Sequence, residues 1–189
     1  MLFKKLVELC KKRITVELWR DGDITWLSNG EVYAKLNEDT SFEFSDIICI
    51  MELSDEKAEC ITTSKAEFLT DERHIFNPRQ AEEIKPVRYS INCDGFPLQP
   101  FVTTKGVLFV PLKHMAIFRD VGCKSYYLSE FRGGYIVLVA VDNMTIGMIR
   151  PHKVNLEAMK DFASGFNTQV LKAHENEFCG GDYQYSLVL

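Results

Sequence analysis

The sequence contains one pattern twice: a short amphipathic helix with basic residues, followed by strands that are separated by tight turns. The first copy covers residues 2–37 and the second covers residues 107–151. A repeated unit of one helix and three strands is more typical of a scaffold that presents surfaces than of one that carries out chemistry. We therefore predict an α+β protein of two related halves that acts by binding.

In the first copy, apolar and polar side chains alternate from Ile14 to Trp19, which is the period of a half-buried strand. Asp21-Gly22 and Asn29-Gly30 are residues that tolerate the positive φ of tight turns. The pattern predicts an antiparallel meander with strands over residues 14–20, 24–28 and 31–36. Ser45 and Ser54 are candidate N-caps of two short helices that complete an N-terminal unit over residues 1–61.

Residues 62–106 are the least regular part of the sequence, because prolines interrupt any long element. This stretch is predicted to be an irregular connector, with a strand over residues 87–92. The second unit, residues 107–189, begins with a strand that enters a helix at Pro111. Strands are predicted over residues 125–130, 135–141 and 145–149, followed by a long C-terminal helix over residues 156–177 and a final strand or exposed tail over residues 182–189.

The longest apolar run, residues 135–141, is far shorter than the roughly 20 residues that cross a bilayer. The N-terminus also lacks the long apolar core of a signal peptide, so a cytoplasmic protein without membrane association is predicted. The 6 cysteines form no CxxC pair and have apolar neighbours. Reduced and mostly buried thiols are therefore expected.

Charge is distributed unevenly along the chain. The net charge is −5, yet residues 1–13 hold five basic side chains against Glu8 alone, so a basic helix is joined to an acidic remainder. Two interpretations stay open for this helix. Its lysines form either a solvated face opposite an apolar stripe or a face that follows a phosphate backbone.

Two segments of the second copy, VLFVPLKHMAIFRD and VAVDNMTIGMI, together with the first copy, resemble the helix-then-strands order of sliding DNA clamp domains. Clamp proteins are acidic outside and line a DNA channel with basic helices, and they form ring-shaped oligomers. The resemblance implies that the DNA-facing residues are Lys4, Lys5, Lys11, Lys12, Arg13, Lys113 and Arg119.

The whole chain is also similar to an uncharacterised group of prophage-borne bacterial proteins that open with sequence like MLFKKLVELCKKR. That resemblance implies a mobile-element context, in which accessory proteins often occupy the surface of a host protein. An acidic inhibitor of a host nucleic-acid-binding or defence protein, including an anti-CRISPR role, is therefore an alternative. Candidate phosphate-mimicking patches are Glu52, Asp55, Glu56 and Glu59, and Asp71, Glu72, Glu82 and Glu83.

The last six residues, QYSLVL, resemble the QxxLxL form of bacterial clamp-binding peptides. In that comparison Gln184, Leu187 and Leu189 would enter a pocket of a protein partner such as a replication protein. A buried final strand is the alternative for the same residues.

A third hypothesis is a cysteine enzyme in which Cys93 is the nucleophile, His114 or His152 the base, and Asp142 the group that orients the base. The sequence has no phosphate-binding glycine loop and no closely spaced zinc ligands, so no cofactor and no metal are predicted. The leading hypothesis is a non-enzymatic interaction protein of phage or mobile-element DNA metabolism.

Overall fold

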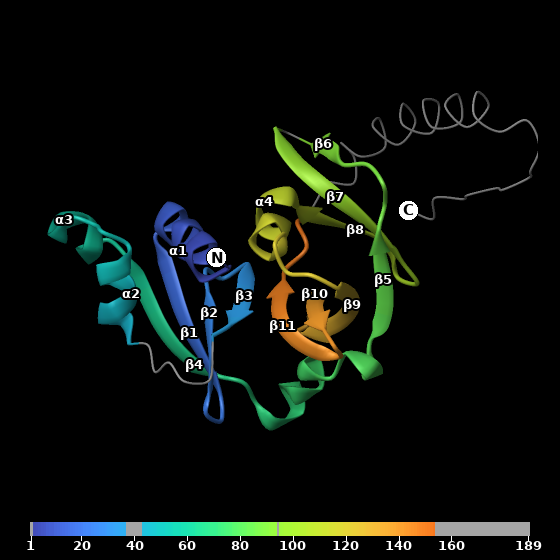
Figure 1. The fold of residues 1–189 in the computed structure, drawn as a ribbon, viewed down its shortest axis with the longest axis horizontal. Helices are drawn as coiled ribbons and strands as arrows, with labels where there is room; N and C mark the ends of the chain where they lie inside the picture. Colours follow the sequence, from blue (N-terminus) through green and yellow to red (C-terminus); the bar gives the residue numbers. More distant parts are fainter. Residues whose placement is uncertain (1, 37–42, 94, 154–189) are drawn as a thin grey trace, which may run out of the picture.

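The computed structural model describes residues 2–36, 43–93 and 95–153 (Figure 1). It is a mixed α/β structure with one large, mostly antiparallel sheet and few helices. The first half contains α1 (Leu2–Arg13), β1 (Thr15–Asp21), β2 (Ile24–Ser28), β3 (Val32–Lys35), α2 (Phe44–Ile50), α3 (Asp55–Glu59) and β4 (Thr62–Glu67).

The second half begins with two 3-10 helices and ends with three long strands. Its elements are η1 (Thr70–Phe76), η2 (Pro78–Gln80), β5 (Glu82–Pro86), β6 (Ile91–Cys93), β7 (Phe96–Thr103), β8 (Gly106–Pro111), α4 (Leu112–Met115), η3 (Ala116–Phe118), β9 (Lys124–Phe131), β10 (Gly134–Val141) and β11 (Met144–Ile149).

The two predicted meanders are present and join edge to edge. The strand order is β4-β1-β2-β3-β11-β10-β9-β5-β7-β6, and β8 pairs with β7. The junction is an antiparallel pairing of β3 with β11, in which Ala34 lies opposite Gly147 and Tyr33 opposite Met148. Each meander is thus preceded by its helix, α1 or α4, and both meanders belong to one continuous sheet.

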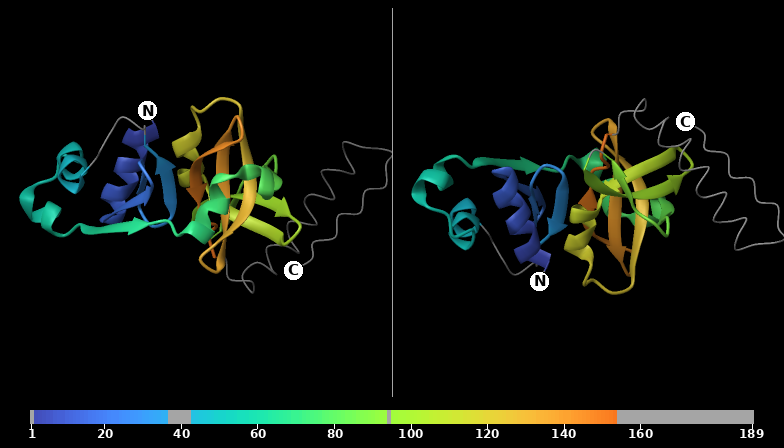
Figure 2. Two further views of the ribbon diagram at one scale, coloured as in Figure 1. Left: turned by 90° about the horizontal axis from the view of Figure 1, so that it is seen from below. Right: turned by 90° about the horizontal axis from the view of Figure 1, so that it is seen from above.

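Side chains alternate between two cores, as expected for strands buried on both faces. On one face, Val16, Leu27 and Val137 pack under α1, α2 and the α4–η3 segment. On the other face, a mainly aromatic core that includes Trp26 is covered by η1, whose Ile75 is fully buried. Figure 2 shows α1 and α4 next to each other on the same side of the strands.

The sheet curls around its second core. Phe131 of β9 lies 5.9 Å from Trp19 of β1 between ring centroids, although four strands separate β9 from β1 in the sheet. Arg132 then places its guanidinium 4.4 Å from the Trp19 ring centroid and donates a 2.7 Å hydrogen bond to Glu72 of η1. This contact lowers the pKa of Glu72, chiefly through the hydrogen bond, and it ties η1 to the β9–β10 turn.

The prediction of an irregular connector over residues 62–106 is wrong, because this stretch contributes four strands, β4 to β7. β4 pairs in parallel with β1, so the N-terminal unit extends past residue 61. β7 accommodates two prolines because each removes only its own ladder donor, while the Pro100 carbonyl still accepts a bond from the Val87 N–H at 3.0 Å. The strand predicted over residues 87–92 is instead β6, which begins at Ile91.

The two short helices after the first meander are confirmed, with one changed boundary. Ser54 is the N-cap of α3, as predicted. The cap of α2 is Glu43 and not Ser45, and its N–H donates to the Asp46 side chain at 2.9 Å. The predicted C-terminal helix over residues 156–177 and the tail over residues 182–189 lie outside the described residues.

Candidate anion-binding surface on the helical face

Two helical segments from opposite halves of the chain lie antiparallel on one face of the sheet. Near the start of α1, Lys5 donates from Nζ to the Ala116 carbonyl at 3.2 Å and to Asp120 at 2.7 Å. At the end of α1, Arg13 forms an ion pair with Glu31, whose other carboxylate oxygen lies 3.2 Å from Nε2 of His114. The basic residues of α1 and of α4–η3 therefore belong to one surface.

The structure divides the seven predicted DNA-facing residues into two groups. Lys5, Lys11 and Arg13 have protein partners. Those of Lys5 and Arg13 are given above, and Lys11 donates from Nζ to the Met51 carbonyl at 2.8 Å. The other four side chains are exposed and make no ion pair or hydrogen bond within the described part of the chain; they are Lys4, Lys12, Lys113 and Arg119. Exposed lysines and arginines without partners can bind phosphates without breaking an existing contact.

A pocket of about 310 Å³ opens at the end of this surface where α1 finishes. Its walls come from Arg13, from the turn between β2 and β3, from the start of α4 and from the segment after β11. The turn is fixed by Asn29, whose side chain accepts hydrogen bonds from the N–H groups of Glu31 and Val32. Gly30 in this turn has φ +85, a conformation that favours glycine.

His114 forms the buried wall of this pocket. Its side chain is 2% exposed, and neither ring nitrogen has a hydrogen-bond partner in the protein. Nε2 is close to Glu31, but the geometry is not that of a hydrogen bond. Burial is the main cause that lowers the pKa of His114 to about 4, and the nearby Glu31 carboxylate opposes this effect. At neutral pH the imidazole is therefore uncharged.

The His114 environment predicts acid sensitivity of the fold. The folded protein holds the His114 ring neutral, whereas the unfolded chain protonates it below the ordinary pKa of 6.5. The free energy of unfolding is therefore highest above pH 6.5 and declines as the pH falls toward about 4. Lys113, Arg13 and His152 face the ring and oppose its protonation, while Glu31 favours it. Between pH 7 and roughly pH 4.5, we expect the unfolding free energy of the unmodified protein to fall by about 2–3 kcal/mol more than that of His114→Leu. Urea denaturation at each pH measures both values. Identical pH profiles of the two proteins would contradict this.

The segment after β11 supplies Lys153 and His152, which sequence reasoning did not group with the basic helix. Arg150 lines the pocket too, but its guanidinium turns to the other face and donates to the Tyr33 hydroxyl at 3.1 Å. Lys153 and Glu31 carry no local sequence signal that links them to α1. The basic C-terminal turn of α1 was the single indication available from the sequence.

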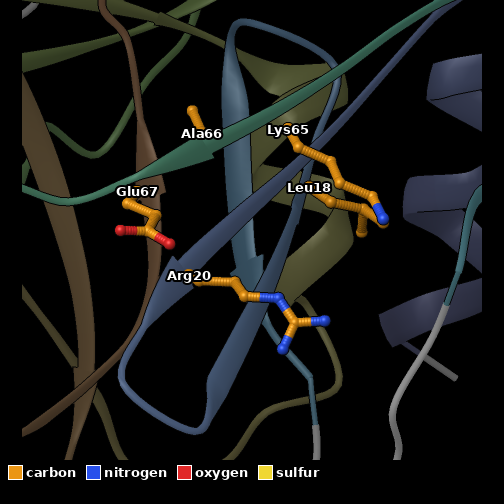
Figure 3. A pocket seen from close by; sticks show the side chains of 5 residues that line it. All are labelled: Leu18, Arg20, Lys65, Ala66 and Glu67. Carbon is orange, nitrogen blue, oxygen red and sulfur yellow. The ribbon is translucent and has the colours of Figure 1, made fainter.

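A second hollow, of about 280 Å³, lies along the pairing of β1 with β4. Figure 3 shows Leu18, Arg20 and Lys65 projecting from these strands to the same side. Glu43 already forms ion pairs with both cations, at 3.9 Å from Arg20 and 2.6 Å from Lys65. The hydrogen bond from Lys65 lowers the pKa of Glu43. Since its charges are paired, this hollow is the weaker candidate.

The proposed cysteine triad is not assembled as predicted with either base, because no ring nitrogen of His114 has a hydrogen-bond partner among the described residues and His152 lies far from Asp142. Asp142 lies in the β10–β11 turn, whereas His152 follows the opposite end of β11. The six residues of β11 separate them by about 17 Å, which is too far for hydrogen bonding. His152 instead stacks on Phe96, the register partner of Cys93, with 5.7 Å between ring centroids.

The expectation of mostly buried thiols is also wrong for the described cysteines. Cys10 alone is buried among them, and burial raises its pKa to about 12. Cys49, Cys60 and Cys123 are exposed, because apolar neighbours along a short helix or turn need not point to the same side as the thiol.

The two acidic patches differ in their surroundings. Glu52, Asp55, Glu56 and Glu59 are exposed on and around α3. In the other patch, Glu72 is 8% exposed and bonded to Arg132, and Glu82 accepts bonds from Thr104. The second patch is therefore not a free acidic surface. The residues of the clamp-binding-like tail, Gln184, Leu187 and Leu189, lie outside the described residues.

Comparisons with models of protein families, with curated proteins and with solved structures found no match. Within residues 2–36, 43–93 and 95–153, no helix has the length and apolar character needed to span a membrane. The same residues contain no group of three His, Cys, Asp or Glu side chains placed to hold a metal ion.

Proposed function

We propose that this protein binds nucleic acid through the helical face and acts as a non-enzymatic interaction protein of DNA metabolism. The observation that supports this most directly is the convergence of unpaired cations from α1 and from α4–η3 on one side of a continuous sheet. Lys4 and Lys12 come from one half of the chain, and Lys113 and Arg119 come from the other.

The arrangement suits a backbone ligand better than a small molecule. The exposed cations extend along two antiparallel helical segments, and the pocket lies at one end of this surface. A linear polyanion can contact such a row of charges at several phosphates together, whereas a small anion can contact one part of it. The remaining surface is acidic overall, which limits nonspecific binding elsewhere on the protein.

Binding of a fluorescent DNA duplex, followed by anisotropy at increasing salt, tests this proposal. Four unpaired cations are expected to release counterions from about four phosphates, so the logarithm of the affinity should fall with the logarithm of salt concentration with a slope of about −4. A duplex that does not bind at low salt would contradict the proposal. So would an affinity that does not change between about 50 and 200 mM salt.

A second candidate function is inhibition of a host nucleic-acid-binding or defence protein by the lobe formed by α2 and α3. Residues 43–60 contain six acidic side chains and one lysine. The lobe projects at the end of the molecule farthest from β7 (Figure 1). This function predicts that a tagged protein captures a host complex from nuclease-treated lysate, and that Asp55→Lys with Glu59→Lys abolishes the capture. Loss of all partners after nuclease treatment would favour DNA binding instead.

A further inference from the structure

The pocket beside His114 contains several features that the extended basic surface does not require. A side chain that is 98% buried would normally have its polar atoms paired, because an unpaired buried nitrogen costs about 1–3 kcal/mol. Both ring nitrogens of His114 lack a hydrogen-bond partner, although the ring forms part of a cavity wall. Each of these nitrogens exposes less than 1 Å² to solvent, so the ring forms the wall of the cavity, and the donors that a ligand reaches there are those of Arg13 and Lys153.

The charged groups around the cavity indicate which ligand this is. Arg13 and Lys153 contribute two cations, and His152 adds a second imidazole. Glu31 is the one carboxylate among the described residues that line the cavity, and its ion pair with Arg13 cancels one of these two positive charges. Lys153 is exposed and forms no hydrogen bond or ion pair within the described part of the chain.

We infer that this pocket binds a phosphomonoester group, and specifically the terminal phosphate of a nucleic-acid strand that lies along the helical face. The strand-end assignment rests on the proposed function, whereas the phosphate assignment rests on the pocket alone. A terminal phosphate has more free oxygen atoms than an internal phosphodiester. It can therefore accept hydrogen bonds from Lys153 and from the N–H groups of Arg13 that do not face Glu31 at the same time.

The cavity has room for this group. A water molecule takes about 30 Å³ of liquid volume, so a cavity of about 310 Å³ holds a phosphate together with part of its sugar. The pocket lies at the Arg13 end of α1, where the basic surface finishes. In Figure 1 β11 runs toward α4, so the segment that carries Lys153 leaves the sheet on this side. A strand bound along the surface would thus present its end to the pocket.

Two measurements on the full chain test the inference. In the first, inorganic phosphate is titrated while the ring signals of His114 are followed by NMR. In the second, the affinity of a short DNA strand with a terminal phosphate is compared with that of the same strand ending in a hydroxyl. We expect saturable shifts of the His114 signals and a preference of about tenfold for the phosphorylated strand. Lys153→Gln should reduce that ratio to about one, while the control Arg79→Gln, at an exposed site in η2, should keep it.

The outcomes separate the two assignments. Phosphate-induced shifts without any preference between the strands would overturn the strand-end assignment and identify the pocket as a site for small phosphomonoesters. If neither strand binds, the proposed function fails, and the His114 shifts still decide whether the pocket binds phosphate. Absence of both the shifts and the preference would overturn the whole inference. A preference that persists in Lys153→Gln would place the recognition of the strand end outside this pocket.

Discussion

Replacement of Lys4, Lys12 and Lys113 by glutamate is expected to weaken binding of duplex DNA by about 100-fold or more at low salt. All three side chains are exposed and unpaired within the described residues, so the substitutions break no internal contact of the fold. Each one removes an attraction to a phosphate and adds a repulsion. The slope of affinity against salt concentration should also become shallower by about three, which fluorescence anisotropy measures directly.

A matched control separates local contacts from the effect of total charge. Arg79, Lys85 and Lys105 are exposed in η2, in β5 and in the β7–β8 turn, away from α1. Their replacement by glutamate changes the net charge by the same amount. We expect this control to retain affinity within a few-fold of the unmodified protein. Equal losses in the two triple variants would show that total charge, rather than the helical face, governs binding.

Replacement of Phe118 by alanine is expected to lower the free energy of unfolding by about 3–5 kcal/mol. The Phe118 ring is fully buried, and it packs η3 against the sheet directly over Gly147 of β11. A Cβ atom at residue 147 would lie 2.2 Å from two carbons of this ring, so the ring occupies the space that any other residue would need. Urea denaturation followed by circular dichroism measures the loss.

The contact also predicts a strong coupling between the two positions. Gly147→Ala alone should cost about 1–3 kcal/mol, because the ring of Phe118 or the strand beneath it must shift. In the Phe118→Ala background the same change should cost little, since the added methyl group enters the space that the ring has left. Additive losses in the double variant would contradict the direct contact.

Local elements followed closely from local sequence. Strands predicted over residues 24–28 and 135–141 correspond to β2 and β10, which begin and end within one residue of those bounds. The reason is that a two-residue period fixes which side chains are buried, and residues such as Asn29-Gly30 accept the backbone geometry of a tight turn. Asp142 and Asn143 both have positive φ in the β10–β11 turn, which agrees with the predicted break there.

The prediction for residues 62–106 is wrong because it treats every proline as the end of a strand. Pro97 and Pro100 indicated a break, yet both lie inside β7. A proline removes one donor from a ladder but leaves its carbonyl, so a strand continues where neighbouring residues supply the remaining bonds. Whether they do so depends on which strands pair with β7, and these are β5, β6 and β8, whose Phe109 lies opposite Pro100.

The candidate site was partly visible in the sequence. The lysines of α1 were identified from their density, but the partners of Lys5 and Arg13 were not, because Asp120 and Glu31 come from other elements. The role of His114 was equally hidden. Its burial depends on the packing of α1 against α4, and no residue near His114 in the sequence indicates that these two helices pack together.

The two meanders, their turns and the basic character of α1 follow from local sequence, since they depend on side-chain period, turn residues and charge within a few positions. Tertiary structure alone decided that β3 pairs with β11, that β4 runs parallel to β1, and that Arg13, His114 and Lys153 surround one pocket. These contacts join residues that are distant in the sequence, such as Thr15 with Thr62 and Ala34 with Gly147. Their register is set by the simultaneous burial of both faces of the sheet, which no short stretch of sequence encodes.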